Sequence, residues 1–206
     1  IKPFNEKITV DYGDEDRNVE PLNEYFEKTF RDVLTGTYSR RYYEEFWADK
    51  ILDGGIAMFD LDDFKIYNDL FGHSVGDDVL KAVAEMLKKG IRSTDKVIRF
   101  GGDEFLLIIP GVREAGLKIL LKDIRESVRE IVFENYPAIK PTVSVGGVIC
   151  SGETVKSALH KADELMYEAK RQKDSVVTAK QGGAGKRSSH KERVLVVDDS
   201  DINREI

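Results

Sequence analysis

The chain has 206 residues, of which 41% are hydrophobic and 34% are charged, a composition typical of a globular protein with a sizeable core. A formal net charge of −6 and an isoelectric point near 5.3 argue against nucleic acid or an anionic membrane surface as a partner. One cysteine, Cys150, excludes an intrachain disulfide and suits a reducing cytoplasm, where we expect the protein. We find no signal-peptide pattern and no apolar run long enough to be a membrane segment.

Residues 1–20 are polar and acidic without clear periodicity, and we interpret them as a linker or the remnant of a preceding domain. The chain begins with Ile rather than Met, so we expect it to be part of a longer protein. A helix is predicted from Pro21, because apolar residues recur over residues 22–33 at the spacing of one helical face. Packing against its own domain and pairing with a second chain as a stalk fit this helix equally well.

The pattern that follows alternates between helices and strands. Helices are predicted at residues 40–52, about 79–87, 114–134 and 155–169. Strands are predicted at residues 55–59, 97–100, 105–109 and 141–149. Gly101 and Gly102 join the middle two strands as a tight hairpin, since glycine accepts positive φ. This order predicts an α+β fold, with a ferredoxin-like βαβ-βαβ core, a central antiparallel hairpin and covering helices.

The C-terminal part of the chain changes in composition. Residues 179–193 are rich in Gly, Ser and basic residues, which predicts a flexible linker. The apolar run at residues 194–197 then ends in the paired acids Asp198 and Asp199, which resembles the first strand and acidic pocket of a response-regulator receiver domain. Residues 194–206 would be the truncated start of such a domain, which would regulate the full-length chain.

Acidic residues gather at two predicted strand ends. Asp60 follows the strand at 55–59, with Asp62 and Asp63 directly after it, and Asp103 and Glu104 lie at the hairpin tip. Carboxylate oxygens suit hard cations such as Mg²⁺, and two such ions can activate an attacking hydroxyl and stabilise a leaving oxygen. Either cluster alone is explained better by turn formation and solvation. Their convergence on one point would make a metal site.

Several motifs occur together in a fixed order and spacing. They are DVLTGTYSRR at residues 32–41, DLDDFKIYND at 60–69, GH at 72–73, GD at 76–77, RFGGDEF at 99–105, VSVG at 143–146 and ADELMYEAK at 162–170. Together they resemble the signature of GGDEF-domain diguanylate cyclases. The resemblance implies a domain over residues 21–178, with a sheet like that of nucleotidyl cyclases and polymerase palms. It also implies an enzyme that condenses two GTP into cyclic di-GMP.

The resemblance assigns a metal site and a reaction. It implies that Asp60, the carbonyl of Leu61, Asp103 and Glu104 hold two Mg²⁺ or Mn²⁺ ions per active site. The base that takes the 3′-hydroxyl proton stays open between Asp103, Glu104 and a metal-bound hydroxide. Each protomer would hold one GTP, so catalysis would need a homodimer.

The resemblance also assigns substrate contacts. Asn68 and Asp77 match the pair that reads guanine, and the chemistry agrees, because a carboxylate accepts from guanine N1 and N2 while an amide meets its acceptors. Taken alone, helix capping explains Asn68, and an N-cap before Val79 explains Asp77. The lysines among the other expected substrate contacts would bind phosphate. These other contacts are Asp63, Phe64, Lys65, Gly101, Gly102 and Lys170.

Arg92 and Asp95 lie at the spacing of the family's RxxD site, at which the cyclic di-GMP product inhibits the enzyme. The resemblance implies that Arg92 binds product phosphate and guanine, that Asp95 accepts from guanine and that Arg99 can join the site. Taken alone, Arg-x-x-Asp is a common salt bridge at a helix end.

One departure from the family pattern concerns the phosphate contacts. Asp174 stands where the family usually has an Arg that contacts phosphate. The exchange removes that contact and adds a like charge, which Lys173 or Arg171 could offset, so we expect weaker GTP binding. Three alternatives stay open: a non-catalytic module that binds cyclic di-GMP, an allosteric GTP-binding module, and a cyclase with a mixed GMP–AMP product, which Asp77 disfavours.

Overall fold

The computed structural model describes residues 19–179, with side chains described from residue 25 onward. The expected N-terminal linker lies almost wholly outside the described residues. The glycine-rich linker, apart from Ala179, and the expected start of a receiver domain at residues 194–206 lie outside them as well.

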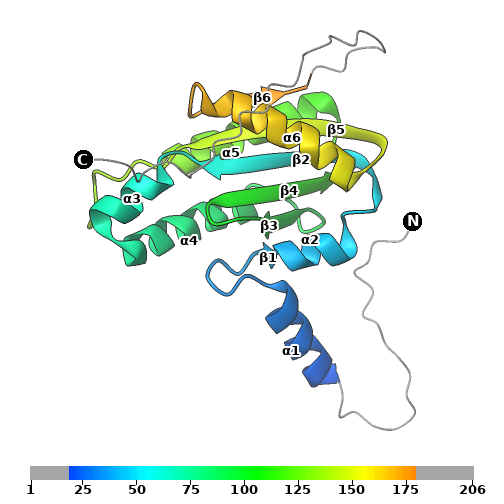
Figure 1. Cartoon of the computed structure of the whole chain (residues 1–206), viewed down its shortest axis with the longest axis horizontal. Coiled ribbons are helices and arrows are strands. Elements are labelled where there is room, and N and C mark those ends of the chain that lie inside the picture. The colour runs from blue at the N-terminus through cyan, green and yellow to red at the C-terminus, as the bar shows by residue number, and fades with distance from the viewer. Residues whose placement is uncertain (1–18, 180–206) are drawn as a thin grey trace, which may run out of the picture.

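Within the described residues, six strands form one sheet in the order β1-β3-β4-β2-β5-β6 (Figure 1). The strands are β1 (Tyr38–Ser39), β2 (Ile51–Leu61), β3 (Lys96–Arg99), β4 (Glu104–Pro110), β5 (Val143–Thr154) and β6 (Val176–Thr178). The central strand β2 runs antiparallel to both β4 and β5, and β3 runs antiparallel to β4. This arrangement of β3-β4-β2-β5 confirms the predicted ferredoxin-like α+β core.

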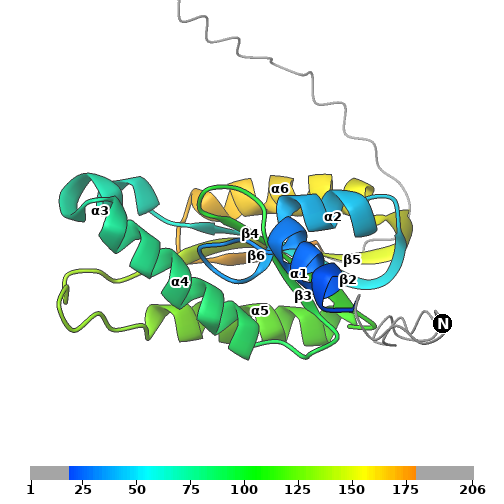
Figure 2. The same ribbon diagram turned by 90° about the horizontal axis from the view of Figure 1, so that it is seen from below.

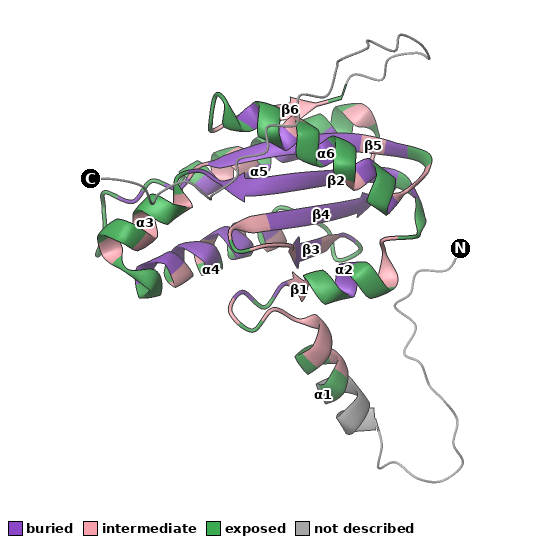
Figure 3. Cartoon of the chain, viewed as in Figure 1, coloured by how far each residue is buried: buried purple, intermediate pink, exposed green. Residues whose placement is uncertain are grey.

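Helices cover both faces of the sheet, as Figure 2 shows. They are α1 (Val19–Phe30), α2 (Arg40–Phe46), α3 (Phe64–Phe71), α4 (His73–Lys89), α5 (Glu114–Arg129) and α6 (Val155–Lys170). Phe59 and Phe105 pack toward α4 and α5, whereas Met58 and Leu106 pack toward α2 and α6. Successive strand residues point to opposite faces, so β2 and β4 are apolar on both sides and buried along most of their length (Figure 3).

The helix predicted at residues 40–52 is shorter than expected. α2 ends at Phe46, a turn follows, and the chain enters β2 at Ile51, which pairs with Thr154 of β5. The predicted helix at 114–134 likewise ends at Arg129, and Ile131 and Ile139 are buried in the loop that follows it. Three elements were not predicted: α3 and the short edge strands β1 and β6.

The helix predicted over residues 22–33 is α1, which ends at Phe30. Phe26 and Phe30 pack on the α2 aromatic residues Tyr42 and Phe46, with 5.0 Å between the ring centroids of Phe30 and Phe46. The C-terminal turns of α1 therefore pack against their own domain, and pairing with a second chain stays a prediction. Between residues 19 and 179, no helix combines the length and apolarity needed to cross a membrane.

Candidate active site

The structure brings the two acidic clusters together where β2 ends. Asp60 and Glu104 are direct partners in the antiparallel β2–β4 pair, and directly opposed residues point to the same face of a sheet. The amide of Leu61 donates to the carbonyl of Asp103 at 3.2 Å, which holds the hairpin tip beside the end of β2. Carboxylates from β2, β4 and the hairpin therefore share one place on the α2 and α6 side of the sheet.

The charges in this cluster are mutually unfavourable. Asp60 is only 3% exposed. Burial raises the pKa of Asp60 to about 6, Lys170 opposes the rise, and the charges of Asp103 and Glu104 add to it. Burial and the neighbouring acids Asp103 and Asp163 likewise raise the pKa of Glu104. A divalent cation would relieve this repulsion.

Lys170, at the C-terminal end of α6, supplies the counter-charge. Its Nζ atom lies 2.7 Å from Oδ2 of Asp60. Burial lowers the pKa of Lys170, but its hydrogen bond to Asp60 and the surrounding acids outweigh this effect and raise it. Sequence reasoning did not single out Asp163, although it precedes Lys170 by seven residues and therefore lies on the same helical face.

The donor set fits a hard cation such as Mg²⁺, because the clustered side chains offer carboxylate oxygens, and burial together with mutual repulsion raises the pKa of Asp60 and Glu104. Over the part of the chain that the structure describes, no three acidic, His or Cys side chains are gathered as a complete ligand set. The expected ligands Asp60, Asp103, Glu104 and the Leu61 carbonyl stay a prediction, in which they would hold the cation together.

Arg99 holds the hairpin in place. Its Nε and Nη2 atoms donate to the carbonyl oxygen of Gly102 at 3.2 and 2.7 Å, and its Nη1 atom donates to the Asp32 carboxylate at 3.2 Å. Burial raises the pKa of Asp32, but hydrogen bonds from Thr35 and the charge of Arg99 outweigh this effect and hold the pKa below its usual value. A Cβ at Gly101 would collide with the Glu104 carboxylate, so the backbone approaches this side chain closely. Arg99 thus contacts the hairpin, and its expected part in the product-inhibition site with Arg92 stays a prediction.

Asn68 and Asp77 lie where α3 meets α4, and both are half-buried. The amide oxygen of Asn68 lies against Gly76, where a Cβ would overlap it. Two capping interpretations are wrong, because α4 begins at His73 with Gly72 as its N-cap. Asp77 is therefore inside α4, and Asn68 is inside α3.

Hydrogen bonds to one buried acid, Asp62, hold the β2–α3 loop in place. Asp62 is buried and accepts hydrogen bonds from the Thr142 hydroxyl at 2.8 Å, the Ser144 hydroxyl at 2.7 Å and the Asp174 amide at 2.8 Å. The three donors hold the Asp62 carboxylate in place, and Asp62 thus positions the loop. The expected substrate contacts Asp63, Phe64 and Lys65 follow it at the start of α3, Asp63 with φ of 57° and Lys65 exposed.

Arg92 and Asp95 form a closed turn before β3. The Asp95 carboxylate is buried and accepts from the backbone amide of Arg92 at 2.9 Å and from the Thr94 hydroxyl at 3.2 Å. The side chain of Arg92 is exposed. The carboxylate therefore caps the backbone of the turn, rather than forming the side-chain salt bridge considered from the sequence.

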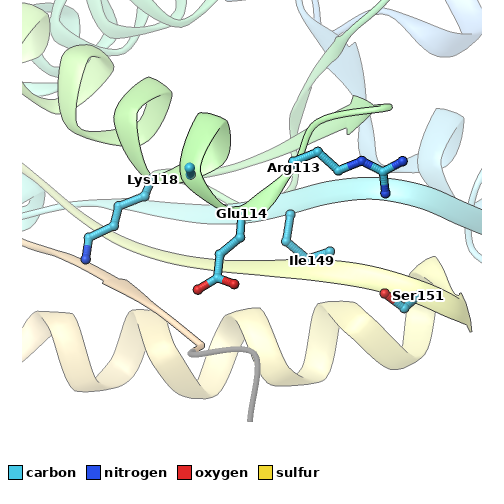
Figure 4. Close-up of a pocket in the computed structure, with 6 residues that line it drawn as sticks. Arg113, Glu114, Lys118, Ile149 and Ser151 are labelled. Carbon is cyan, nitrogen blue, oxygen red and sulfur yellow. The ribbon is translucent and has the colours of Figure 1, made fainter. Parts of the chain in front are cut away.

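Both faces of the sheet carry a surface hollow among the described residues. A hollow of about 660 Å³ lies between α2 and α6 and reaches Glu104 and Asp163. Figure 4 shows a second hollow, of about 390 Å³, lined by Arg113, Lys118 and Ser151 among others. Ser151 pairs with Asp53 near the start of β2, so the second hollow lies at the far end of this strand from the acidic cluster.

Comparison with known proteins agrees with this geometry. The family described as "Diguanylate cyclase, GGDEF domain" matches residues 29–175. The chain is 33% identical to diguanylate cyclase DgcP of Pseudomonas aeruginosa over 159 residues, which is 73% of this chain and 24% of DgcP. It is 33% identical to the response regulator PleD of Caulobacter vibrioides over 171 residues, which is 77% of this chain and 38% of PleD.

Solved structures give the same result. The coiled coil and GGDEF domain of DgcB from Caulobacter crescentus, in complex with c-di-GMP, matches with a TM-score of 0.70 and 26% identity over 78% of this chain and 91% of that one. Diguanylate cyclase SiaD of P. aeruginosa, in complex with its activator SiaC, matches with a TM-score of 0.66 and 32% identity, covering 78% and 66% of the two chains.

The fold and the acidic cluster define a domain of the nucleotide-cyclising type. The chain belongs to the GGDEF diguanylate cyclase family. It spans 24% of DgcP and 38% of PleD, well under half the length of either. The family match ends at residue 175 and gives no support to the receiver start expected at residues 194–206.

Proposed function

We propose that this chain is a diguanylate cyclase, which condenses two GTP into cyclic di-GMP and two pyrophosphate with Mg²⁺ or Mn²⁺. The observation that carries the proposal is the convergence of Asp60, Glu104 and the Asp103 hairpin at the end of β2. The 33% identity to DgcP, which is named as a diguanylate cyclase, supports it.

Each protomer would hold one GTP. Divalent cations would supply charge stabilisation at the phosphates and lower the pKa of the attacking 3′-hydroxyl. Asp60 and Glu104, with Asp103, would hold these cations, two per site. Lys170 lies close enough to Asp60 to neutralise phosphate charge at the same place. Because there is little covalent chemistry for the protein to perform, its contribution is positioning and charge stabilisation.

Guanine would be read by Asn68 and Asp77 at the α3–α4 junction. The Asp77 carboxylate would accept from N1 and N2 of guanine, a donor edge that adenine lacks. A buried polar group left without its partner discriminates strongly between such ligands. The half-buried positions of both side chains support this role.

The chain would act as a homodimer, in which each 3′-hydroxyl attacks the α-phosphate on the partner protomer. Product inhibition at Arg92 and Asp95 belongs to the same proposal. The exposed Arg92 side chain supports it. The Asp95 carboxylate, already held within its turn, would have to accept from guanine in addition to the Arg92 amide.

The test is incubation of the chain with GTP and Mg²⁺, followed by product analysis by mass. We expect cyclic di-GMP, two pyrophosphate for each cyclic product, no product from ATP, and specific activity that rises with protein concentration because the active form is a dimer. The Asp103→Ala variant is expected to be inactive. If the wild type binds cyclic di-GMP but makes none at high protein concentration, the chain is a non-catalytic binding module. An active Asp103→Ala variant would contradict the metal assignment.

A further inference from the structure

Three non-glycine residues of the described chain have positive φ, and all three lie at one junction. They are Asp63 at 57°, Lys173 at 53° and Asp174 at 43°. Asp63 belongs to the β2–α3 loop, and the other two belong to the α6–β6 turn. Side chains with a Cβ rarely adopt this conformation, which persists where surrounding contacts enforce it.

Two contacts join the loop and the turn directly. The Nζ atom of Lys173 donates to both carboxylate oxygens of Asp63, at 2.7 and 2.8 Å. The amide of Asp174 donates to Asp62 at 2.8 Å. The turn therefore touches the β2–α3 loop immediately after the candidate metal ligands Asp60 and Leu61.

Asp174 is anchored on the opposite side, by α5. Its carboxylate lies 3.2 Å from Nε of Arg129 and 3.8 Å from Nε of Arg125. Arg125 also donates from Nη1 to the Asp174 carbonyl at 2.7 Å. The like charge that the sequence suggested beside the triphosphate is therefore offset by two guanidinium groups.

We propose that Asp174 is a positioning residue, which Arg125 and Arg129 anchor so that the turn presents Lys173 as the phosphate-binding cation of this site. The usual arginine at position 174 is thus replaced by a lysine one residue earlier. Lys173 suits this role because its side chain is 56% exposed and already lies at Asp63 of the β2–α3 loop. This inference rests on the proposed cyclase function and adds a residue to its substrate site.

The first test replaces the anchored acid by the family's usual residue. Asp174→Arg would place a third guanidinium beside Arg125 and Arg129, so we expect a lower Tm and a KM for GTP that does not fall. Asp123→Arg, at an exposed position of α5, makes the same change in charge and is the matched control, expected to change neither quantity. A lower KM for GTP with an unchanged Tm would overturn the proposal, because position 174 would then simply be a lost phosphate contact.

The second test removes the cation but keeps its length. Lys173→Met is expected to raise the KM for GTP roughly fivefold, because the free energy of one exposed charge pair corresponds to a change of about this size. The kcat at saturating GTP is expected to change by less than about twofold. Lys122→Met, exposed on α5, is the control. An unchanged KM in Lys173→Met overturns the role of Lys173, and a loss of kcat without a change in KM does so as well.

Failure of this inference is distinguishable from failure of the cyclase proposal. The Tm of Asp174→Arg needs no turnover, and GTP binding by Lys173→Met can be measured by calorimetry. A wild type that binds GTP but makes no cyclic di-GMP contradicts the cyclase proposal alone. Unchanged Tm and unchanged GTP binding in the two variants contradict the anchored turn alone.

Discussion

Replacing Asp60 by Asn is expected to lower cyclase activity by at least about a thousandfold, because it removes a ligand of the catalytic cations. The same change should raise the Tm of the metal-free protein at pH 8. Burial, with the acids nearby, raises the pKa of Asp60 from 3.8 to about 6. The ionised Asp60 carboxylate therefore lowers the free energy of unfolding by up to about 3 kcal/mol at pH 8. A neutral amide at this position avoids that cost.

The gain in Tm expected for Asp60→Asn depends on pH. Between pH 3.8 and about 6 the folded protein holds a proton on Asp60 that the unfolded chain has already released. Stability from this group is therefore greatest at low pH and falls as the pH rises through about 6. The gain in Tm on Asp60→Asn should be full above this pH and vanish near pH 4. Asp123→Asn is the control, and either a lower Tm at pH 8 or retained activity would contradict the burial and the role of Asp60.

Replacing Gly146 by Ala is expected to destabilise the fold by about 3 kcal/mol or more, the upper end of the range for core overpacking. A Cβ on Gly146 of β5 would collide with backbone atoms of Ala162 and Met166, and would lie 2.8 Å from the carbonyl carbon of Leu165. Backbone of α6 cannot move aside as a flexible side chain does. Because α6 carries Lys170, activity should be lost together with stability.

Thermal unfolding followed by circular dichroism measures this effect. Gly102→Ala is the matched control for stability, since no heavy atom lies within 4 Å of a Cβ built there. We expect its Tm to stay close to that of the wild type. A Gly146→Ala variant with a wild-type Tm would contradict the close packing of α6 on β5.

Local patterns predicted most of the fold because β2, β4 and β5 are apolar on both faces and the Gly101-Gly102 hairpin joins β3 to β4. They failed where pairing with distant residues decides the conformation. Ile51 and Leu52 continue a helical pattern, but their pairing with β5 draws them into β2. Helix α3 places Phe64, Tyr67 and Phe71 partly against the core at helical spacing, but its eight residues make only about two turns, too few for a clear periodic pattern.

In the candidate site, too, local features were predicted and contacts between distant residues were not. Acids at a strand end and a hairpin tip predicted the meeting of Asp60, Asp103 and Glu104, because both positions are local features. The contacts that position them join residues far apart in sequence. Such contacts are those of Lys170 with Asp60, of Arg99 with Asp32 and of Asp174 with Arg129. No periodicity or turn signal encodes a pairing of this kind.

The most direct test of a cation site shared by β2 and the hairpin is a Mn²⁺ titration, followed by electron paramagnetic resonance, in the presence of a non-hydrolysable GTP analogue. We expect saturable Mn²⁺ binding by the wild type and at least about tenfold weaker binding by both Asp60→Asn and Asp103→Asn, because the two acids would hold the same cations. Wild-type affinity for Mn²⁺ in either variant would contradict a shared site.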